Sequence, residues 1–269
     1  MFFSALHLIY MLIPLAVTGI LFLIFRTRSQ NTKRTVVLAV SLLNTLQHIL
    51  KPYIYPQYGG MSIGAPSTAY NMCALLILIA PIVLLVGSEL WQNFMFYIGS
   101  IAGYSSILVT YWLDSPMEEQ VRFVICHGLL FVSSFLPLLF GIYKVNYRKC
   151  WRLPFVFYTC LMIQIITNMI NFQLGIVGDV GDITMYEYIV RENPCWAMCP
   201  PQDYGFILDL VSPLTPSVFL DNGSGYTPIL WYGVPMFILI TAVGFLLGML
   251  LDRKRFVSDA KRFYHFLFG

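Results

Sequence analysis

The sequence predicts an all-α fold: a polytopic membrane protein built as a bundle of seven transmembrane helices, with its N-terminus outside and its C-terminus in the cytoplasm. Three observations lead to this expectation. Hydrophobic residues make up 58% of the 269-residue chain, charged residues make up only 11%, and the basic residues gather in a few connections. Soluble domains carry about twice that share of charge. The chain is therefore expected to be an integral membrane protein.

The apolar residues fall into seven runs of about twenty residues, the length that a helix needs to cross a bilayer. The first run lacks a basic n-region and is long enough to span, so we expect it to remain as a helix. The runs show no apolar–polar alternation, and helices satisfy their own backbone in lipid, so strands are not predicted. The second run is the shortest. The single transmembrane domain, residues 1–269, is expected to have spans at about 3–25, 35–50, 68–87, 91–112, 121–143, 153–175 and 229–251.

Lysine and arginine residues predict the orientation. Thirteen of the sixteen lie in the connections 26–34 and 144–152 and in the tail after residue 251, which seven spans would place on one side of the membrane. Acidic residues collect on the other side. The positive-inside rule therefore places the C-terminus in the cytoplasm. Because the basic residues are dispersed among helix ends, they do not predict a nucleic-acid partner.

This topology brings several reactive side chains to a similar depth. Cys73 follows the start of the third span by about five residues and His127 follows the start of the fifth by about six, which places both roughly 8–9 Å below the outer surface. His7 and His48 fall in the same layer. Ionisable groups inside a membrane are costly and by default suggest a function. The structural alternatives are a small buried thiol for Cys73, an interhelical hydrogen bond for His7 and a helix-end position for His48.

A thiol and an imidazole at one depth can form a nucleophilic dyad. The imidazole of His127 would remove the proton of Cys73, and we expect the two side chains to pair at about 3–4 Å. Attack on a lipid ester would give an acyl-thioester, and Asn71, Asn168 and Asn171 lie near the level where they could stabilise the oxyanion. The alternative for these asparagines is ordinary hydrogen bonding between helices.

The segment 176–228 is expected to form an outer loop that caps the bundle. It contains Cys195 and Cys199, which could form a disulfide outside the cell. Two cysteines alone make a weak case for a metal, so the sequence predicts neither a metal site nor a cofactor.

The chain contains the short motifs Ser4-Ala5-Leu6-His7, Met72-Cys73, His127-Gly128, Asn168 to Phe172 and Ile207-Leu208-Asp209-Leu210. Together they resemble the YwaF-like / transmembrane protein 164 acyltransferase family of integral membrane proteins. The resemblance implies a membrane-embedded lipid acyltransferase or lipid ester hydrolase of a bacterial cell membrane, with Cys73 as the nucleophile and His127 as its base. Membrane phospholipids would be its substrates or bound ligands. The related androgen-induced lipid hydrolases are similar in plan but use a threonine nucleophile.

Two other classes of function fit the same polar layer. A non-enzymatic transporter or binding protein for lipids or small molecules could line a cavity with it, although the spans lack the carboxylates and inverted repeat common in coupled transporters. A zinc hydrolase could use the histidines and Cys73 as ligands, but no H-x-x-x-H or C-x-x-C pair occurs within the spans.

Overall fold

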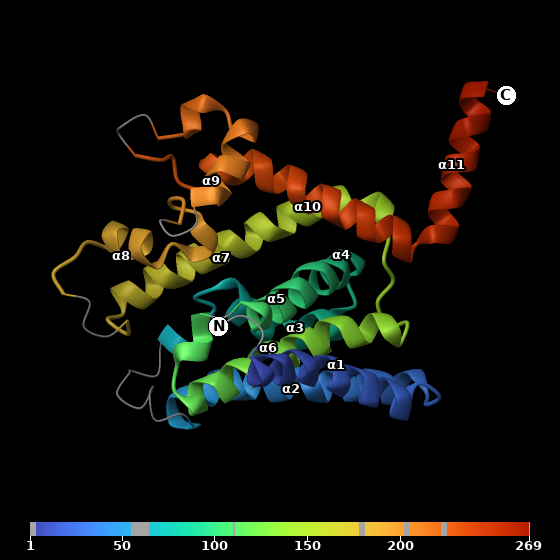
Figure 1. Cartoon of the computed structure of the whole chain (residues 1–269), viewed down its shortest axis with the longest axis horizontal. Coiled ribbons are helices and arrows are strands. Elements are labelled where there is room, and N and C mark those ends of the chain that lie inside the picture. Colours follow the sequence, from blue (N-terminus) through green and yellow to red (C-terminus); the bar gives the residue numbers. More distant parts are fainter. Residues whose placement is uncertain are drawn as a thin grey trace. The chain divides into compact units, whose positions relative to one another are not determined.

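The computed structural model describes residues 4–54, 65–109, 111–177, 181–201, 205–221 and 225–268, and in these ranges the chain is helical and contains no strand. Figure 1 follows its helices from the N-terminus to the C-terminus. The longer helices are α1 Ala5–Phe25, α2 Gln30–Ile54, α3 Met72–Val86, α4 Glu89–Phe94, α5 Ser100–Leu108, α6 Met117–Leu139, α7 Leu153–Gln173, α8 Met185–Glu192, α9 Gly205–Val211, α10 Leu230–Leu251 and α11 Arg253–Phe268. The shorter ones are η2 Ala65–Ser67, η3 Met95–Gly99, η4 Tyr111–Asp114, η5 Tyr147–Arg152, η6 Pro194–Trp196, η7 Ser212–Leu214 and η8 Ser217–Phe219.

Four helical segments of the described chain are long and apolar enough to cross a membrane: α1, α6, the run of η5 and α7, and α10. They correspond to the first, fifth, sixth and seventh expected spans. The third expected span forms α3, which is apolar but has only 15 residues. A 15-residue helix is shorter than a bilayer core requires. Residues 68–71, which precede α3, are not helical.

The second and fourth expected spans are helical but differ in detail from the prediction. The second lies within α2, which is longer than expected and includes Lys33, Arg34 and Lys51, and these charges lower its mean hydropathy. The fourth is divided into α4, η3 and α5, which follow one another without a break, and η3 is a π-helix. A π-helical stretch inside an α-helix is rare and often lies near a functional site.

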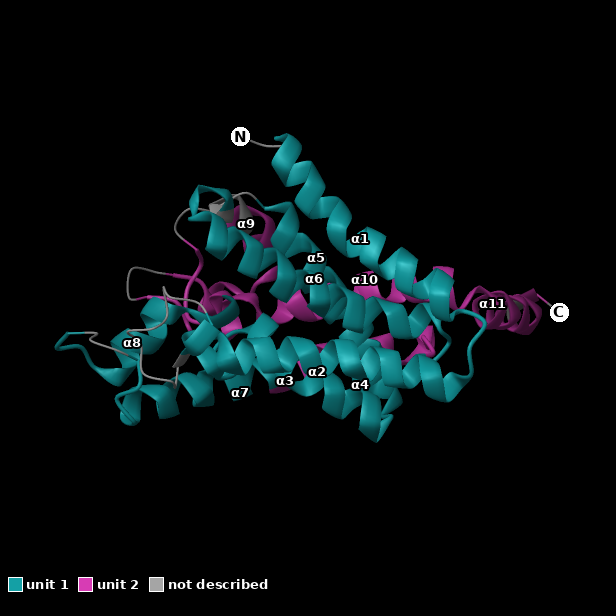
Figure 2. Cartoon of the chain, turned by 90° about the horizontal axis from the view of Figure 1, so that it is seen from below, with its two compact units in different colours: residues 1–143, 160–195 teal, residues 144–159, 196–269 magenta. Residues whose placement is uncertain are grey.

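The chain forms two compact units, which Figure 2 distinguishes by colour. Unit 1 contains residues 1–143 and 160–195, and unit 2 contains residues 144–159 and 196–269. Within unit 1, α6 packs against α1, α2, α3 and α5. Of the four segments that could span a membrane it is the most buried, with 72% of its apolar window covered against 17% for α1. Arg122, His127, Ser133 and Ser134 of α6 therefore lie inside unit 1.

Two glycines let α5 and η3 lie directly against α6. A Cβ at Gly103 would stand 2.7 Å from the backbone nitrogen of Phe131 and 2.8 Å from the carbonyl oxygen of His127. A Cβ at Gly99 would stand 2.3 Å from the Ser134 hydroxyl. The two glycines are four residues apart, the spacing of the GxxxG motif that allows helix backbones to approach closely in membranes. A Cβ at Gly128 of α6 would stand 3.3 Å from Cγ of Pro14 in α1.

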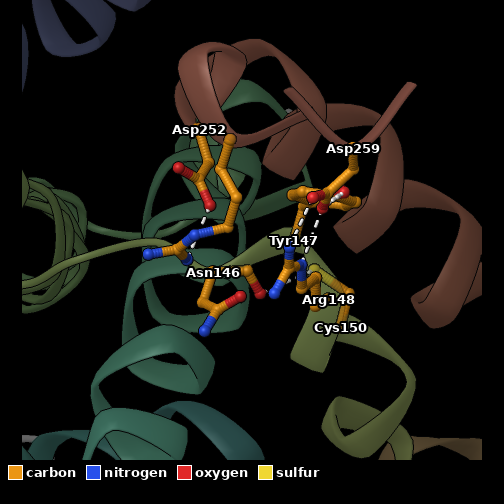
Figure 3. Close-up of polar contacts among 7 residues, drawn as sticks. Asn146, Tyr147, Arg148, Cys150, Asp252 and Asp259 are labelled. Carbon is orange, nitrogen blue, oxygen red and sulfur yellow. Dashed lines mark hydrogen bonds and ion pairs between the residues drawn. The ribbon is translucent and has the colours of Figure 1, made fainter. Parts of the chain in front are cut away.

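Unit 2 is organised around α10, which packs against η5. The Cys150 thiol donates a hydrogen bond to the Gly244 carbonyl at 3.0 Å, and a Cβ at Gly244 would clash with Leu153. At the end of α10, Tyr147 and Arg148 of η5 both bind Asp259 of α11, as Figure 3 shows. These two donors lower the pKa of the Asp259 carboxyl to about 2. This contact ties the amphipathic α11 to η5.

Residues 176–228, the expected outer loop, contain α8, α9 and several short 3-10 helices. Residues 178–180, 202–204 and 222–224 of this loop lie outside the described part of the chain. α8 begins with a capping box in which the Thr184 side chain accepts from the Glu187 backbone and the Glu187 side chain accepts from the Thr184 backbone. Such a reciprocal cap satisfies two otherwise unbonded donors at a helix start.

Candidate functional site

A polar pocket lies within unit 1 where α2, α3, α5 and α6 meet, and its volume is about 240 Å³. The wall includes four of the residues selected from the sequence: Cys73, His127, His48 and Asn71. These residues come from three different helices or their ends, and they line one pocket. The described residues that line it are Gln47, His48, Lys51, Tyr70, Asn71, Cys73, Ala74, Ile77, Ser106, Arg122, Phe123, Cys126 and His127.

Cys73 is the second residue of α3, so its thiol lies beside the N-terminal turn of that helix. Asn71 caps the helix, because its Oδ1 accepts a hydrogen bond from the Ala74 N–H at 2.9 Å. The backbone N–H groups of the first turn have no intrahelical acceptor and carry the positive end of the helix dipole. The Ser106 side chain of α5 lies within hydrogen-bonding reach of the Cys73 thiol. Ser106 donates its own proton to the Ala102 carbonyl at 2.7 Å, so its oxygen can accept from the thiol.

His127 is fixed by its neighbours one turn earlier in α6. Its Nδ1 donates to the Phe123 carbonyl at 2.9 Å, and the two rings lie with their centroids 4.0 Å apart. A proton on Nδ1 leaves Nε2 with a lone pair, which is the form that a base requires. The residue lies ten positions after the start of α6, about 15 Å along the helix. It is therefore further from the helix start than the sequence predicted, because α6 begins at Met117 rather than at residue 121.

The expected hydrogen-bonded pair of Cys73 and His127 is not formed. Both side chains are described and both line the pocket, but no hydrogen bond joins them. The thiol contacts Ser106 instead. The close approach of α5 to α6 at Gly103 brings Ser106, one turn further along α5, to the pocket wall. Sequence analysis did not identify Ser106, although the GxxxG spacing that positions it is visible in the sequence.

The other selected polar residues hold the segment that leads into α3. His48 Nε2 donates to the Thr68 carbonyl at 3.1 Å. Asn171 Nδ2 donates to the Thr68 hydroxyl at 2.9 Å, and Asn168 Nδ2 donates to the Tyr70 carbonyl at 2.8 Å. Asn168 and Asn171 therefore make structural hydrogen bonds from α7 to the non-helical segment that leads into α3, and not to another helix as the alternative to an oxyanion role had it. Neither is on the pocket wall, whereas Asn71 is.

His7 does not line the pocket. Its side chain is completely buried, and its Nε2 donates to the Ile107 carbonyl near the end of α5 at 2.9 Å. Ser4 caps α1 by accepting from the His7 backbone N–H. This is the interhelical hydrogen bond that we considered for His7, and it joins α1 to α5.

Two basic residues on the pocket wall were missed by sequence analysis. Lys51 of α2 is 2% exposed, and its ammonium group lies 4.9 Å from the centre of the Tyr70 ring. Arg122 of α6 is 9% exposed and forms an ion pair with Glu119, in which Nε donates to Oε2 at 2.7 Å. A signal was present, because both residues lie in or beside expected apolar spans, where a charge is costly.

All six cysteines lie in the described part of the chain, and all are thiols, so the structure lacks the disulfide expected between Cys195 and Cys199. Cys195 has left-handed backbone angles, with φ at 52°, and its thiol donates to Gln164 Oε1 at 3.4 Å. Burial raises the pKa of the Cys195 thiol to about 11. Such a thiol is a poor nucleophile at neutral pH.

Within the described ranges, no three His, Cys, Asp or Glu side chains lie close enough together to hold a metal ion. Comparisons with protein-family models, with curated proteins and with solved structures found no match for the chain. The pocket must therefore be interpreted from its own chemistry.

Proposed function

We propose that the protein is a membrane-embedded lipid acyltransferase or lipid ester hydrolase, with Cys73 as the nucleophile and His127 as the base. One observation carries this proposal: a single pocket in the interior of unit 1 has both a thiol and an oriented imidazole on its wall. A substrate ester in the pocket would lie between the two side chains, and it would replace the contact of the thiol with Ser106. Apo enzymes often lack the short contacts that form with substrate.

The reaction consists of two acyl transfers. His127 Nε2 takes the proton of the Cys73 thiol as Sγ attacks the ester carbonyl carbon. The tetrahedral intermediate then expels the alcohol, which leaves with the proton from His127, and a C–S bond replaces the C–O bond. In the second transfer water or the hydroxyl of another lipid attacks the thioester, gives its proton to His127 and releases the thiol. No redox step is involved, and the histidine ends each cycle neutral.

Two features of α3 support the thiol in this role. Its position in the first helical turn places the positive end of the helix dipole beside a developing thiolate. In this proposal the Cys73 N–H and the side-chain NH₂ group of Asn71 would donate to the oxyanion, since Asn71 uses its Oδ1 for the cap. Together they form a candidate oxyanion hole. Asn71 thus takes the role that was expected of three asparagines.

The proposed setting is a cell membrane, crossed seven times by α1, α2, α3, the composite helix of α4, η3 and α5, α6, α7 and α10. The basic connections would lie in the cytoplasm and the segment 176–228 would cap the outer side. This topology opens the pocket toward the outer leaflet, where phospholipid esters are available without extraction from the bilayer.

The test measures phospholipid turnover and the acyl-enzyme in the purified full chain, reconstituted in vesicles that contain a fluorescent phospholipid. Cys73→Ala and His127→Ala should each abolish release or transfer of the labelled chain, since residues that act as one unit fail together. Cys160→Ala is the matched control, because Cys160 is a completely buried thiol in α7 that does not line the pocket. A wild-type Cys73 peptide should gain the mass of one acyl chain, and hydroxylamine should remove it. Turnover that persists in Cys73→Ala would refute the mechanism.

The contact between Cys73 and Ser106 favours a second candidate. If the thiol serves only as a polar wall group, the same pocket would belong to a non-enzymatic transporter or binding protein for lipids or small molecules. The wild-type protein would then retain phospholipid but release no chain, and its Cys73 would carry no acyl group.

A further inference from the structure

The last helix of the chain, α11, begins where a candidate membrane span ends. α10 ends at Leu251 and is long and apolar enough to cross a membrane, and α11 starts two residues later at Arg253. Asp252 lies between them with φ at −105° and ψ at 36°, and α11 turns sharply away from the axis of α10 (Figure 1). A helix that leaves a span at a steep angle runs along the membrane surface.

The sequence of α11 separates into an apolar face and a basic face. Positions three, four or seven apart share one face of an α-helix. The apolar face carries Phe256, Val257, Ala260, Phe263, Tyr264 and Phe268. The basic face carries Lys254, Arg255, Lys261, Arg262 and His265.

Most of the apolar face of α11 is exposed. At its edge, Phe256 packs against Tyr147 of η5 with the ring centroids 5.6 Å apart. The exposed fractions of Phe263, Tyr264 and Phe268 are 63%, 62% and 75%. Several neighbouring apolar side chains on a surface mark an interaction site. Because α11 starts at the membrane boundary, lipid is the partner that lies next to this face.

The charge of α11 favours an anionic surface. The helix has five lysine and arginine residues and one acidic residue, Asp259. The Asp259 carboxylate accepts hydrogen bonds from Tyr147 and Arg148, so its charge is already compensated (Figure 3). η5, which packs against α10, also carries Lys149 and Arg152. Clusters of about four to eight basic residues beside a span or on an amphipathic helix attract anionic lipids.

We propose that α11 lies in the membrane interface and binds the headgroups of anionic phospholipids. Its aromatic face would enter the boundary with the acyl chains, and its basic face would remain in the headgroup layer. Affinity of this kind combines buried apolar area with electrostatic attraction. The inference depends on α10 as a membrane span and not on the catalytic role of Cys73.

The test is hydrogen–deuterium exchange of the full chain in vesicles of phosphatidylcholine alone or of phosphatidylcholine mixed with phosphatidylglycerol. Both leaflets of each vesicle have the same composition, so the direction of insertion does not affect the result. The backbone amides of residues 256–268 should exchange at least about tenfold more slowly in the mixed vesicles, because binding opposes local opening of the helix. High salt should reduce this difference, since it screens the attraction.

A variant that carries Lys254→Gln, Lys261→Gln and Arg262→Gln should lose the difference between the two kinds of vesicle. Glutamine has nearly the same helix propensity as lysine and arginine, so the helix itself is preserved. The matched control removes three exposed basic residues of the connection 26–34: Arg26→Gln, Arg28→Gln and Arg34→Gln. Equal exchange of the wild type in both kinds of vesicle, an unchanged difference in the first variant, or its loss in the control would overturn the proposal.

Two aromatic residues of α11 test which face enters the membrane. Tyr264→Ser should speed exchange in both kinds of vesicle, whereas Phe266→Ser should have a smaller effect, because Phe266 is an exposed aromatic residue among the basic positions. Equal effects of the two changes would contradict the assigned face. Slow exchange that depends on protein concentration and not on lipid charge would indicate a second copy of the chain as the partner and would also overturn the proposal.

The outcome is independent of catalysis. Cys73→Ala should show the exchange of the wild type, because Cys73 lies in unit 1 and α11 lies in unit 2. The expected exchange in a chain without phospholipid turnover would support the lipid-binding helix and refute the enzyme. Turnover without a difference between the two kinds of vesicle would do the reverse.

Discussion

The backbone contact between α5 and α6 can be tested by adding one methyl group. In Gly103→Ala the new Cβ would meet two backbone atoms of α6 at 2.7 and 2.8 Å, closer than the 3.4 Å at which ordinary contact begins. Backbone atoms cannot rotate away, so the helices must separate by several tenths of an ångström. Overpacking of this kind costs about 1–3 kcal/mol. The gain in helix propensity from glycine to alanine, about 1 kcal/mol, offsets part of it.

Two other glycines provide a graded comparison. In Gly99→Ala the closest atom is the Ser134 hydroxyl oxygen, which a side-chain rotation could move, so the cost should be smaller. In Gly19→Ala, within α1, no atom lies within 4 Å of the new Cβ, so the variant should be as stable as the wild type or more stable.

The assay is thermal unfolding of the purified full chain in detergent, followed by tryptophan fluorescence. At about 2–4 °C per kcal/mol, a net cost of up to about 2 kcal/mol should lower the unfolding midpoint of Gly103→Ala by up to about 8 °C. The midpoints should follow the order Gly103→Ala, Gly99→Ala and Gly19→Ala, from lowest to highest. Equal midpoints for Gly103→Ala and Gly19→Ala would refute the close approach of α5 to α6, and with it the reason for the position of Ser106.

Three further predictions concern topology, pH and the cap of α3. An impermeant maleimide should label Ser217→Cys in whole cells above the background of the native cysteines and should leave Ser258→Cys unlabelled, and the reverse pattern would exclude the proposed orientation. The Asp259 carboxyl has its pKa lowered from 3.8 to about 2. The contact through which it ties α11 to η5 is therefore complete above pH 4 and is lost as the pH falls toward 2. A spin label at position 258 should become more mobile over that range, whereas the same label in Asp259→Asn should be mobile at every pH. A label whose mobility neither change affects would contradict the contact between α11 and η5. Asn71→Ala removes the N-cap and should cost about 1 kcal/mol of stability in the same unfolding assay, with Asn71→Ser largely restoring it.

Much of the helical fold could be predicted from the sequence because a bilayer core demands long apolar runs, and four such runs form helices long enough to span it. The details that were missed depend on tertiary contacts. α2 continues to Ile54, beyond the expected end of its span, and includes a buried Lys51. The π-helix in the fourth run has no signature in apolar periodicity. α6 starts at Met117, earlier than expected, and Pro116 occupies its N-cap position.

The candidate site was predicted in part, because residues at a similar depth were expected to meet. That reasoning grouped Cys73, His127 and His48 correctly but also included His7, which hydrogen-bonds to the end of α5 instead. Depth alone does not determine the direction in which a side chain points. That direction depends on how each helix is rotated about its own axis, and the rotation depends on close contacts such as that of Gly103 with α6. The basic side chains of the pocket were missed because neither Lys51 nor Arg122 was considered as a site residue.

The π-helical stretch η3, Met95–Gly99, also has a consequence for how this chain should be aligned with any relative. A π-turn absorbs one extra residue without rotating the helix on either side of it. An α-helical relative of the same shape would therefore be one residue shorter between Met95 and Gly99, and its counterparts of Gly103 and Ser106 would carry numbers lower by one. An ungapped alignment would pair Ser106 with the wrong residue and hide the equivalence of the two pockets. We therefore expect that an alignment of this chain with an α-helical relative needs a gap of one residue at η3.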